Sequence, residues 1–249
     1  MKLSNTDLKL FSKQIVLKKV GVSGQKKLLK SKVLIVGMGG LGCPLLLYLV
    51  SSGVGEIGIA DHDKIELSNL NRQILYNFSD IGKLKVEVAK NRVNKINPKI
   101  KINTFSKKIT KDNISKIIKN YDIICDGSDN FETRFIINDH SKKMKKNLIS
   151  AAISKFEGQL FNFNFKLKTP CYRCFMPKSP TTDQNCEDDG IISPVAGILG
   201  SLQANEVIKT ILDTKQIKSG NILVINGMLS KFRNIKLMIN PKCVNRCKD

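Results

Sequence analysis

The chain of 249 residues lacks the sequence features of a secreted protein, of a disulfide-linked protein and of a histidine-based catalytic triad. Residues 1–12 alternate polar and apolar side chains and contain no continuous apolar core like that of a secretory signal. The seven cysteines are an odd number in a chain without such a signal, which argues against a disulfide framework. The only histidines, His62 and His140, have no triad partner nearby and are expected at the surface. We therefore expect a cytoplasmic protein.

Arginine is scarce although the chain is strongly basic. Lysine and arginine total 42 against 21 acidic residues, a net charge of +21, but only six of the 42 are arginine. Arginine is the usual residue for bidentate contacts with phosphates and bases. The composition therefore favours a solvated lysine surface over a nucleic-acid site, and a basic face that steers an acidic protein partner stays an alternative.

Charged residues are absent between Val33 and Gly55, a stretch long enough to resemble a membrane span. Six glycines and one proline within it favour another interpretation. The segment Val33-Leu-Ile-Val-Gly-Met-Gly-Gly-Leu-Gly42 and the apolar residues after it predict a buried strand, a glycine turn and a helix. Such a turn brings backbone N–H groups close to a phosphate at a helix N-terminus. A packing turn that binds nothing is the alternative.

An acidic residue follows the next predicted strand, Glu56–Ala60. Asp61 stands 24 residues after Gly37, the separation at which an acid reaches a ribose hydroxyl in a βαβ nucleotide fold. The glycine turn and Asp61 together indicate a nucleotide site more specifically than either feature does alone. The alternative is that Asp61 is an acidic residue on a surface loop.

Hydrogen-bonding side chains are dense just beyond this strand, in Ser68-Asn-Leu-Asn-Arg-Gln73. Arg72 in this segment can clamp a phosphate. Lys85 falls in the first turn of a predicted helix over 83–96, which Pro98 ends.

The α/β alternation continues with a strand over 100–105, a helix over 112–119 and a strand over 122–125. Asp129 follows this last strand, and ligands bind at the carboxyl ends of strands in open α/β sheets. It is a candidate ligand for Mg²⁺. The alternative, compatible with the first, is the N-cap of a helix over 131–145.

The second half of the chain predicts strands at 147–152, 221–225 and 232–239, and a helix over 194–212. The period-two pattern of 159–165 predicts a half-exposed strand, and the last two strands are expected to pair around Asn226 and Gly227. Residues 178–193 are polar and expected to be mobile. They contain Cys186, whose acidic neighbours would raise a thiol pKa.

Two close cysteine pairs lie far apart in the sequence, and such pairs predict a closed, structural zinc site with four thiolate ligands. The alternatives are buried free thiols or a redox pair. The four residues are Cys171, Cys174, Cys243 and Cys247.

In their order and spacing, these motifs resemble the HesA/MoeB/ThiF family of sulfur-carrier-protein adenylyltransferases, relatives of ubiquitin-activating enzymes. The resemblance covers essentially the whole length and includes Gly197–Lys209. It implies a Rossmann-like, mostly parallel sheet that continues into an antiparallel part. The single adenylating domain would comprise a helical arm (1–30, interrupted at Gly21 and Gly24), a nucleotide-binding half (31–150) and a zinc- and carrier-binding half (151–249).

The resemblance implies that ATP and Mg²⁺ activate the C-terminal glycine of a ubiquitin-like carrier ending in Gly-Gly. The products are the carrier acyl-adenylate and pyrophosphate, and a cysteine desulfurase or rhodanese-type donor then supplies sulfur. The carrier would serve molybdopterin or thiamine synthesis. By family match, Asn69, Arg72, Gln73 and Lys85 surround the phosphates, and Asp129 holds Mg²⁺. The remaining residues of the implied ATP site are Gly37, Gly39, Gly40, Gly42, Asp61, Asp63 and Asn130.

The chain departs from the family pattern at three places. Lys13 stands where members carry an arginine that reaches the partner subunit's site in a homodimer, and lysine keeps the charge but not the fork. Three residues instead of two separate the last cysteine pair, a spacing that zinc tolerates. Cys186 matches a loop cysteine that links covalently to the carrier in the thiamine branch and is dispensable in the molybdopterin branch.

Three other functions fit part of the pattern. An NAD-dependent oxidoreductase would use the glycine turn and Asp61 but leaves Arg72 and Lys85 unexplained. A tRNA-modifying dehydratase of the same superfamily would use the basic charge, but those relatives lack the full cysteine set. An inactive scaffold would not need Asp129.

Overall fold

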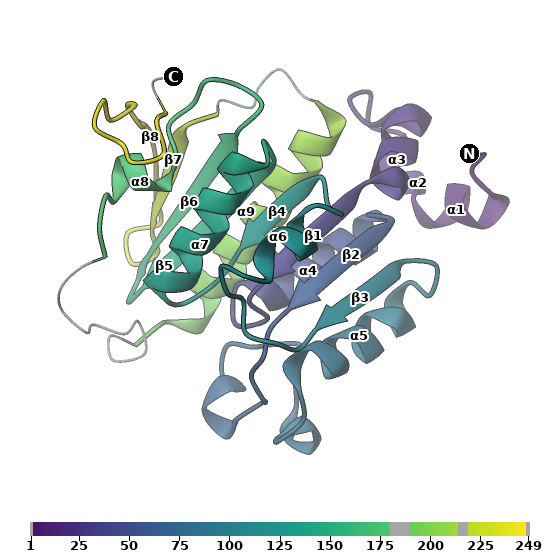
Figure 1. Cartoon of the computed structure of the whole chain (residues 1–249). Coiled ribbons are helices and arrows are strands. Elements are labelled where there is room, and N and C mark those ends of the chain that lie inside the picture. Colours follow the sequence, from purple (N-terminus) through teal and green to yellow (C-terminus); the bar gives the residue numbers. More distant parts are fainter. Residues whose placement is uncertain (1, 180–189, 214–218, 248–249) are drawn as a thin grey trace.

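The computed structural model describes residues 2–179, 190–213 and 219–247. An eight-stranded sheet in the order β3-β2-β1-β4-β5-β6-β7-β8 forms its centre (Figure 1). The strands are β1 (Lys32–Val36), β2 (Glu56–Ala60), β3 (Lys101–Phe105), β4 (Ile123–Asp126), β5 (Asn147–Ser154), β6 (Glu157–Asn164), β7 (Asn221–Asn226) and β8 (Lys231–Lys236).

Strands β3, β2, β1, β4 and β5 are parallel, and β5 to β8 are antiparallel. The predicted mixed α/β sheet is therefore confirmed. The uncharged stretch from Val33 to Gly55 holds β1, the glycine turn and α4, so most of its apolar side chains belong to the core. Over the described ranges, no helix combines the length and hydropathy that a membrane span requires.

Helices cover both faces of the sheet. One hydrophobic cluster joins it to α3, α4, α5 and α9, and a second joins it to α6, α7 and the cysteine-bearing segments. The described helices are α1 (Asn5–Leu10), α2 (Ser12–Ile15), α3 (Gly21–Lys30), α4 (Gly42–Ser52), α5 (Lys85–Ile96), α6 (Ile114–Ile118), α7 (Phe131–Lys143), α8 (Tyr172–Phe175) and α9 (Ser193–Leu212), with short 3-10 turns at Leu67–Asn69 and Phe78–Asp80.

The helical arm differs from the prediction at one glycine. The helical run is interrupted over residues 16–20, and Gly21, with a φ of +58°, is the first residue of α3. Gly24 instead lies buried inside α3. A Cβ at this position would be 2.7 Å from Leu212 Cδ2, so the missing side chain lets α3 approach α9 closely. Gly24 therefore serves helix packing and does not break the helix.

Strand β6 is more buried than its alternating pattern predicts. Phe161, Asn162 and Phe163 are all buried in succession. Asn162 lies on the face that α9 covers, and its Nδ2 donates to Glu206 Oε2 of that helix at 3.1 Å. Asn162 is therefore a buried polar residue with a hydrogen-bond partner, although the sequence pattern places it at an exposed position. The expected pairing of the last two strands is present, with Asn226 opposite Lys231.

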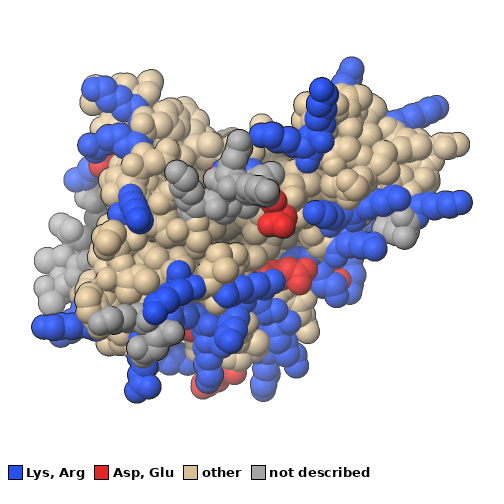
Figure 2. Space-filling view, turned by 90° about the horizontal axis from the view of Figure 1, so that it is seen from above, with Lys and Arg blue, Asp and Glu red and all other residues tan. Residues whose placement is uncertain are grey.

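Lysine and arginine are spread over the visible face in Figure 2, with a few acidic side chains among them. This distribution matches the dispersed lysines of the sequence. On this face the positive charge does not gather in a single patch.

The buried Asp7 fixes the start of the arm. Its carboxylate accepts hydrogen bonds from Ser4 N and Oγ at 3.0 and 2.7 Å, and from Lys99 Nζ at 2.8 Å. These bonds, chiefly that from Lys99, lower the pKa of Asp7 from 3.8 to about 2. Because the folded pKa is depressed, the stabilisation is present above pH 3.8 and is lost as the pH falls toward 2.

Asp7→Asn is expected to lower the free energy of unfolding by roughly 1 kcal/mol at pH 7, like the loss of a helix cap. The difference from the wild type should shrink as the pH falls from 4, because the native carboxylate then takes up its proton. Urea unfolding between pH 7 and pH 3 measures both effects. Asp112→Asn, on an exposed turn, is the control and should change little. A deficit that stays constant with pH would contradict this prediction.

Candidate functional site

A cavity of about 450 Å³ opens at the carboxyl ends of the parallel strands. Its walls come from the turn after β1, the residues that follow β2 and β3, the start of α5 and the turn after β4. This is the edge at which open α/β sheets bind ligands, and the volume is in the range of small-molecule sites. Sequence-distant segments therefore form one pocket.

The structure places most of the predicted site residues on this cavity. Arg72, Lys85 and Asp129 all line it, although they come from three separate segments. The other predicted residues on its walls are Gly37, Gly39, Gly40, Asp61, Asp63, Asn69, Gln73 and Asn130.

Gly42 was predicted to contact the nucleotide, but it does not line the cavity. A Cβ on Gly42 would lie 2.0 Å from Gly37 O, so its role is to let the turn fold back on itself. Gly37 has a φ of +92°, which favours glycine. At Gly39 a Cβ would meet only Gln73 Nε2, at 3.7 Å, so this is the position where the backbone leaves room for a ligand.

Asp61, which follows β2, holds the glycine turn in place through hydrogen bonds to its carboxylate. Its Oδ2 accepts a hydrogen bond from Met38 N at 2.7 Å, and its Oδ1 accepts one from Asp63 N at 2.8 Å. Burial raises the pKa of Asp61, while nearby Lys85 and these two N–H groups act in the opposite direction. The carboxylate therefore has a structural task that the sequence did not reveal, in addition to its place on the cavity wall.

The cations of the cavity are held by neighbouring groups. Lys85 is 6% exposed, and its Nζ lies 2.9 Å from Asp63 Oδ2. Arg72 Nη1 donates to Ser68 O at 2.9 Å and to Asn71 Oδ1 at 3.1 Å. Fixed positive charge of this kind suits a polyphosphate, since it needs little reorganisation when the anion arrives.

Gln73 and Asp129 both line the cavity. Gln73 is buried, and its Oε1 has no hydrogen-bond partner among the described residues. Asp129 is exposed, and its Oδ1 accepts from Asn130 Nδ2 at 3.1 Å. The N-cap of α7 is Asn130, whose Oδ1 accepts from Thr133 N at 2.9 Å, so the predicted alternative role of Asp129 as the cap is wrong. The donor set thus fits a nucleotide with Mg²⁺.

Three cations on the cavity wall were not among the predicted site residues. Lys107 and Lys108 follow β3, and the rule that ligands meet strand ends could have identified them. Arg134 lies one turn into α7 and is buried, which its position in a helical pattern did not indicate. Lys13 is exposed on α2 and does not line the cavity. Cys186 lies outside the described residues.

The four predicted zinc ligands form one cluster, the cysteine cluster, whose ligand atoms all lie within 4.8 Å of one another. Cys171 Sγ and Cys247 Sγ each lie 3.7 Å from Cys243 Sγ. Tetrahedral zinc with Zn–S bonds of about 2.3 Å separates its sulfurs by about 3.8 Å, so this spacing fits the metal. The three-residue interval is accommodated by Arg246 in a left-handed conformation, with a φ of +47°.

Polar groups around the cysteine cluster join it to α7. Asn245 Nδ2 lies 3.6 Å from Cys171 Sγ and donates to Asp139 Oδ1 at 2.7 Å. Arg173 binds the same carboxylate through Nε and Nη2 at 2.7–2.9 Å. Hydrogen bonding from Cys247 lowers the pKa of Cys171, while burial raises the pKa of Cys243 and the hydrogen bond to Cys171 raises that of Cys247. Thiolate is the form that binds zinc.

The glycine turn supplies a matched pair of variants. Gly42→Ala is expected to lower the free energy of unfolding by about 1–3 kcal/mol, because its Cβ would collide with backbone. Gly39→Ala should change stability by less than about 0.5 kcal/mol. It should nevertheless weaken binding of Mg-ATP about tenfold, since the methyl group enters the cavity. Urea unfolding and calorimetric titration measure the two effects, and equal stability of the two variants would contradict the assignment.

Comparison with known proteins identifies the family. The ThiF family model matches residues 11–245. "Adenylyltransferase and sulfurtransferase MOCS3" of Culex quinquefasciatus is 44% identical over 238 residues, which are 95% of this chain and 54% of that protein. The protein of the same name from Dictyostelium discoideum is 40% identical over 250 residues, covering 99% and 59%. The chain therefore spans little more than half the length of these relatives.

Solved structures share the fold. A crystal structure of E. coli MccB with ATP is 27% identical, with a TM-score of 0.76 over 89% of this chain and 68% of that chain. Another, of MccB with AMPCPP and selenomethionyl MccA, is 24% identical, with a TM-score of 0.84 over 99% and 75%. The match to the family model and the identity with these relatives show that the chain belongs to the ThiF family.

Proposed function

We propose that this chain adenylylates the C-terminal glycine of a ubiquitin-like sulfur carrier protein, using ATP. The observation that carries the proposal is the gathering of Arg72, Lys85 and Asp129 with the glycine turn on one cavity. The family membership and the name of the MOCS3 relatives support an adenylyltransferase of this kind. The MccB structures contain ATP in one case and a form of MccA in another, which supports a site for a nucleotide and a second ligand.

In the proposed reaction, a carboxylate oxygen of the carrier's last glycine attacks the α-phosphorus of ATP. The bond from this phosphorus to the oxygen that bridges to the β-phosphorus breaks, and pyrophosphate leaves. Negative charge grows on the phosphoryl oxygens during this displacement, so fixed cations and positioning supply most of the catalysis. The acyl-adenylate that results is open to a sulfur donor, for which a cysteine desulfurase or a rhodanese-type protein is proposed.

The residues have distinct proposed roles. Asp61 binds the ribose while its backbone contacts hold the glycine turn. Arg72 and Lys85, with Asn69 and Gln73, surround the phosphates. Asp129, beside Asn130, holds Mg²⁺, which when bound neutralises charge on the phosphates. Asp63 keeps Lys85 in place through the ion pair of 2.9 Å.

Two further proposals concern assembly. The cysteine cluster holds a structural Zn²⁺, because four thiol ligands leave no open position for a substrate. The chain is proposed to act as a homodimer in which the exposed Lys13 reaches the partner subunit's site. The pathway, molybdopterin or thiamine, depends on which carrier fits.

Exchange of radiolabelled pyrophosphate into ATP tests the reaction directly. Exchange should depend on a carrier that ends in Gly-Gly, and Asp129→Ala should reduce it by about 100-fold or more, since it removes a charged group that acts in the transition state. Asp112→Ala is the control and should retain exchange. NADH should not displace ATP. Absence of exchange with every Gly-Gly carrier of the source organism would refute the proposed function.

Metal analysis tests the cysteine cluster separately. The purified chain should contain about one zinc per molecule, and Cys174→Ser should lose it on dialysis against a chelator, with a lower melting temperature. Cys125→Ala, which removes a buried thiol of β4 outside the cluster, should keep the metal. A metal-free wild-type chain that melts at the same temperature as the loaded one would contradict a structural zinc.

A further inference from the structure

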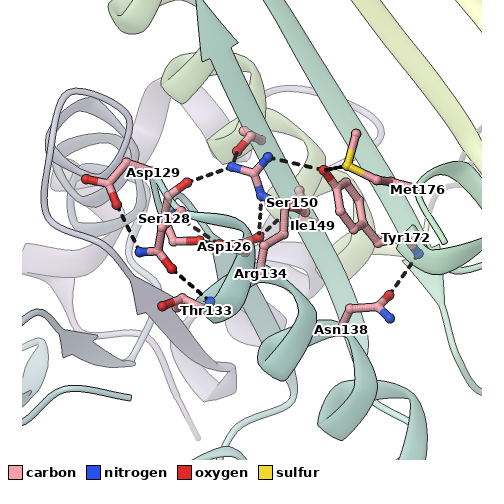
Figure 3. Close-up of polar contacts among 12 residues, drawn as sticks. Asp126, Ser128, Asp129, Thr133, Arg134, Asn138, Ile149, Ser150, Tyr172 and Met176 are labelled. Carbon is pink, nitrogen blue, oxygen red and sulfur yellow. Dashed lines mark hydrogen bonds and ion pairs between the residues drawn. The ribbon is translucent and has the colours of Figure 1, made fainter. Parts of the chain in front are cut away.

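Arg134 is a buried charged residue on the cavity wall that the proposed reaction does not use. It is 6% exposed and projects from α7 under the turn after β4 (Figure 3). Burial of a guanidinium is costly unless partners compensate it. Its Nε lies 3.5 Å from Oδ2 of Asp126, a carboxylate that is itself fully buried.

Both members of this ion pair, Asp126 and Arg134, form hydrogen bonds with Ser128. Asp126 Oδ1 accepts from Ser128 N at 3.0 Å and from Ser128 Oγ at 2.6 Å. Arg134 Nη2 donates to Ser128 O at 2.6 Å. The amide, hydroxyl and carbonyl of a single residue are thus all bound by one buried pair of opposite charges.

The carbonyl of Ser128 belongs to the peptide bond that leads into Asp129. Because a peptide group is planar, fixing this carbonyl also fixes the direction in which the chain enters Asp129. Asp129 is exposed toward the cavity, and its carboxylate is the proposed ligand of Mg²⁺. The guanidinium of Arg134 can therefore influence the position of Asp129 through the planar Ser128–Asp129 peptide group, without itself contacting the nucleotide.

Other contacts of Arg134 among the described residues hold the guanidinium itself. Nη1 lies 3.4 Å from Tyr172 Oη, Nη2 also lies 3.4 Å from Ala151 O, and the guanidinium carbon is 5.5 Å from the centre of the Tyr172 ring. Arginine can make such a divergent set because its donors lie in a rigid plane. A lysine would keep the positive charge beside Asp126, but its single ammonium group could not donate to Ser128, Ala151 and Tyr172 at the same time.

We propose that Arg134 is a positioning residue that fixes the Ser128–Asp129 peptide and so sets the site for the magnesium ion of Mg-ATP. This inference rests on the proposed use of Asp129 in nucleotide binding. It goes beyond that proposal by assigning the magnesium dependence to a residue that acts on the metal site through the Ser128–Asp129 peptide. A purely structural role for the ion pair would affect stability without changing the response to Mg²⁺.

The test compares ATP affinity in EDTA and in Mg²⁺ by calorimetric titration of the full chain, with no carrier present. The wild type should bind ATP more tightly with Mg²⁺, and Asp129→Ala should abolish this gain. Arg134→Lys should lose most of the gain, by about tenfold or more, while its affinity in EDTA stays within about twofold of the wild type. Higher Mg²⁺ concentration should partly restore binding to Arg134→Lys.

Two further variants separate positioning from folding. Ser150→Ala removes the 2.7 Å hydrogen bond from Ser150 Oγ to Asp126 Oδ2 but leaves Ser128 held, so it should keep the full gain from Mg²⁺. The double variant Asp126→Asn with Arg134→Met removes both buried charges and should lose the gain while remaining folded by circular dichroism. If Arg134→Lys and the double variant both keep the gain, or if the wild type shows none, the inference is wrong.

The same experiment separates this inference from the proposed function. Mg²⁺-dependent ATP binding that requires Arg134, without carrier-dependent exchange, would support the positioning role and refute the proposed reaction. Carrier-dependent exchange that proceeds in Arg134→Lys with the same Mg²⁺ requirement as in the wild type would support the proposed reaction and refute the positioning role.

Discussion

Backbone contact between the turns after β1 and β4 is the constraint on which the cavity depends. A Cβ on Gly37 would lie 2.7 Å from Gly127 O, so a side chain at Gly37 would force the two turns apart. Gly127 N in turn donates to Val36 O at 2.9 Å. Because β1 and β4 are adjacent parallel strands, this contact brings the glycine turn and Asp129 to the same edge of the sheet. Every proposed step at the cavity assumes that proximity.

Two of the cations that line the cavity are paired with carboxylates. Lys85 is bound to Asp63, and Arg134 lies beside Asp126. Such pairs hold the cations in place before a ligand arrives, at the cost of burying charge. The net charge of the chain does not explain this arrangement, since most of its lysines are exposed and do not line the cavity.

The sequence predicted those parts of the fold and site that depend on local pattern. The order of strands and helices followed from apolar runs and glycine turns, and Asp61 and Asp129 were found because each follows a strand. Residues whose environment depends on distant segments were misjudged. Gly24 and Asn162 take their roles from α9, which comes much later in the chain. Arg134 resembles any helical arginine until the fold places Asp126 and Tyr172 around it.

Strand β8 forms one open edge of the sheet among the described residues and is exposed along its whole length. An unpaired edge of this kind can template the addition of a strand from another molecule, which leads to aggregation. Lys231, Arg233 and Lys236 are spaced along this edge, and like charges on a second edge would repel them. Part of the lysine excess thus opposes edge-to-edge association, a benefit independent of any ligand that the chain binds.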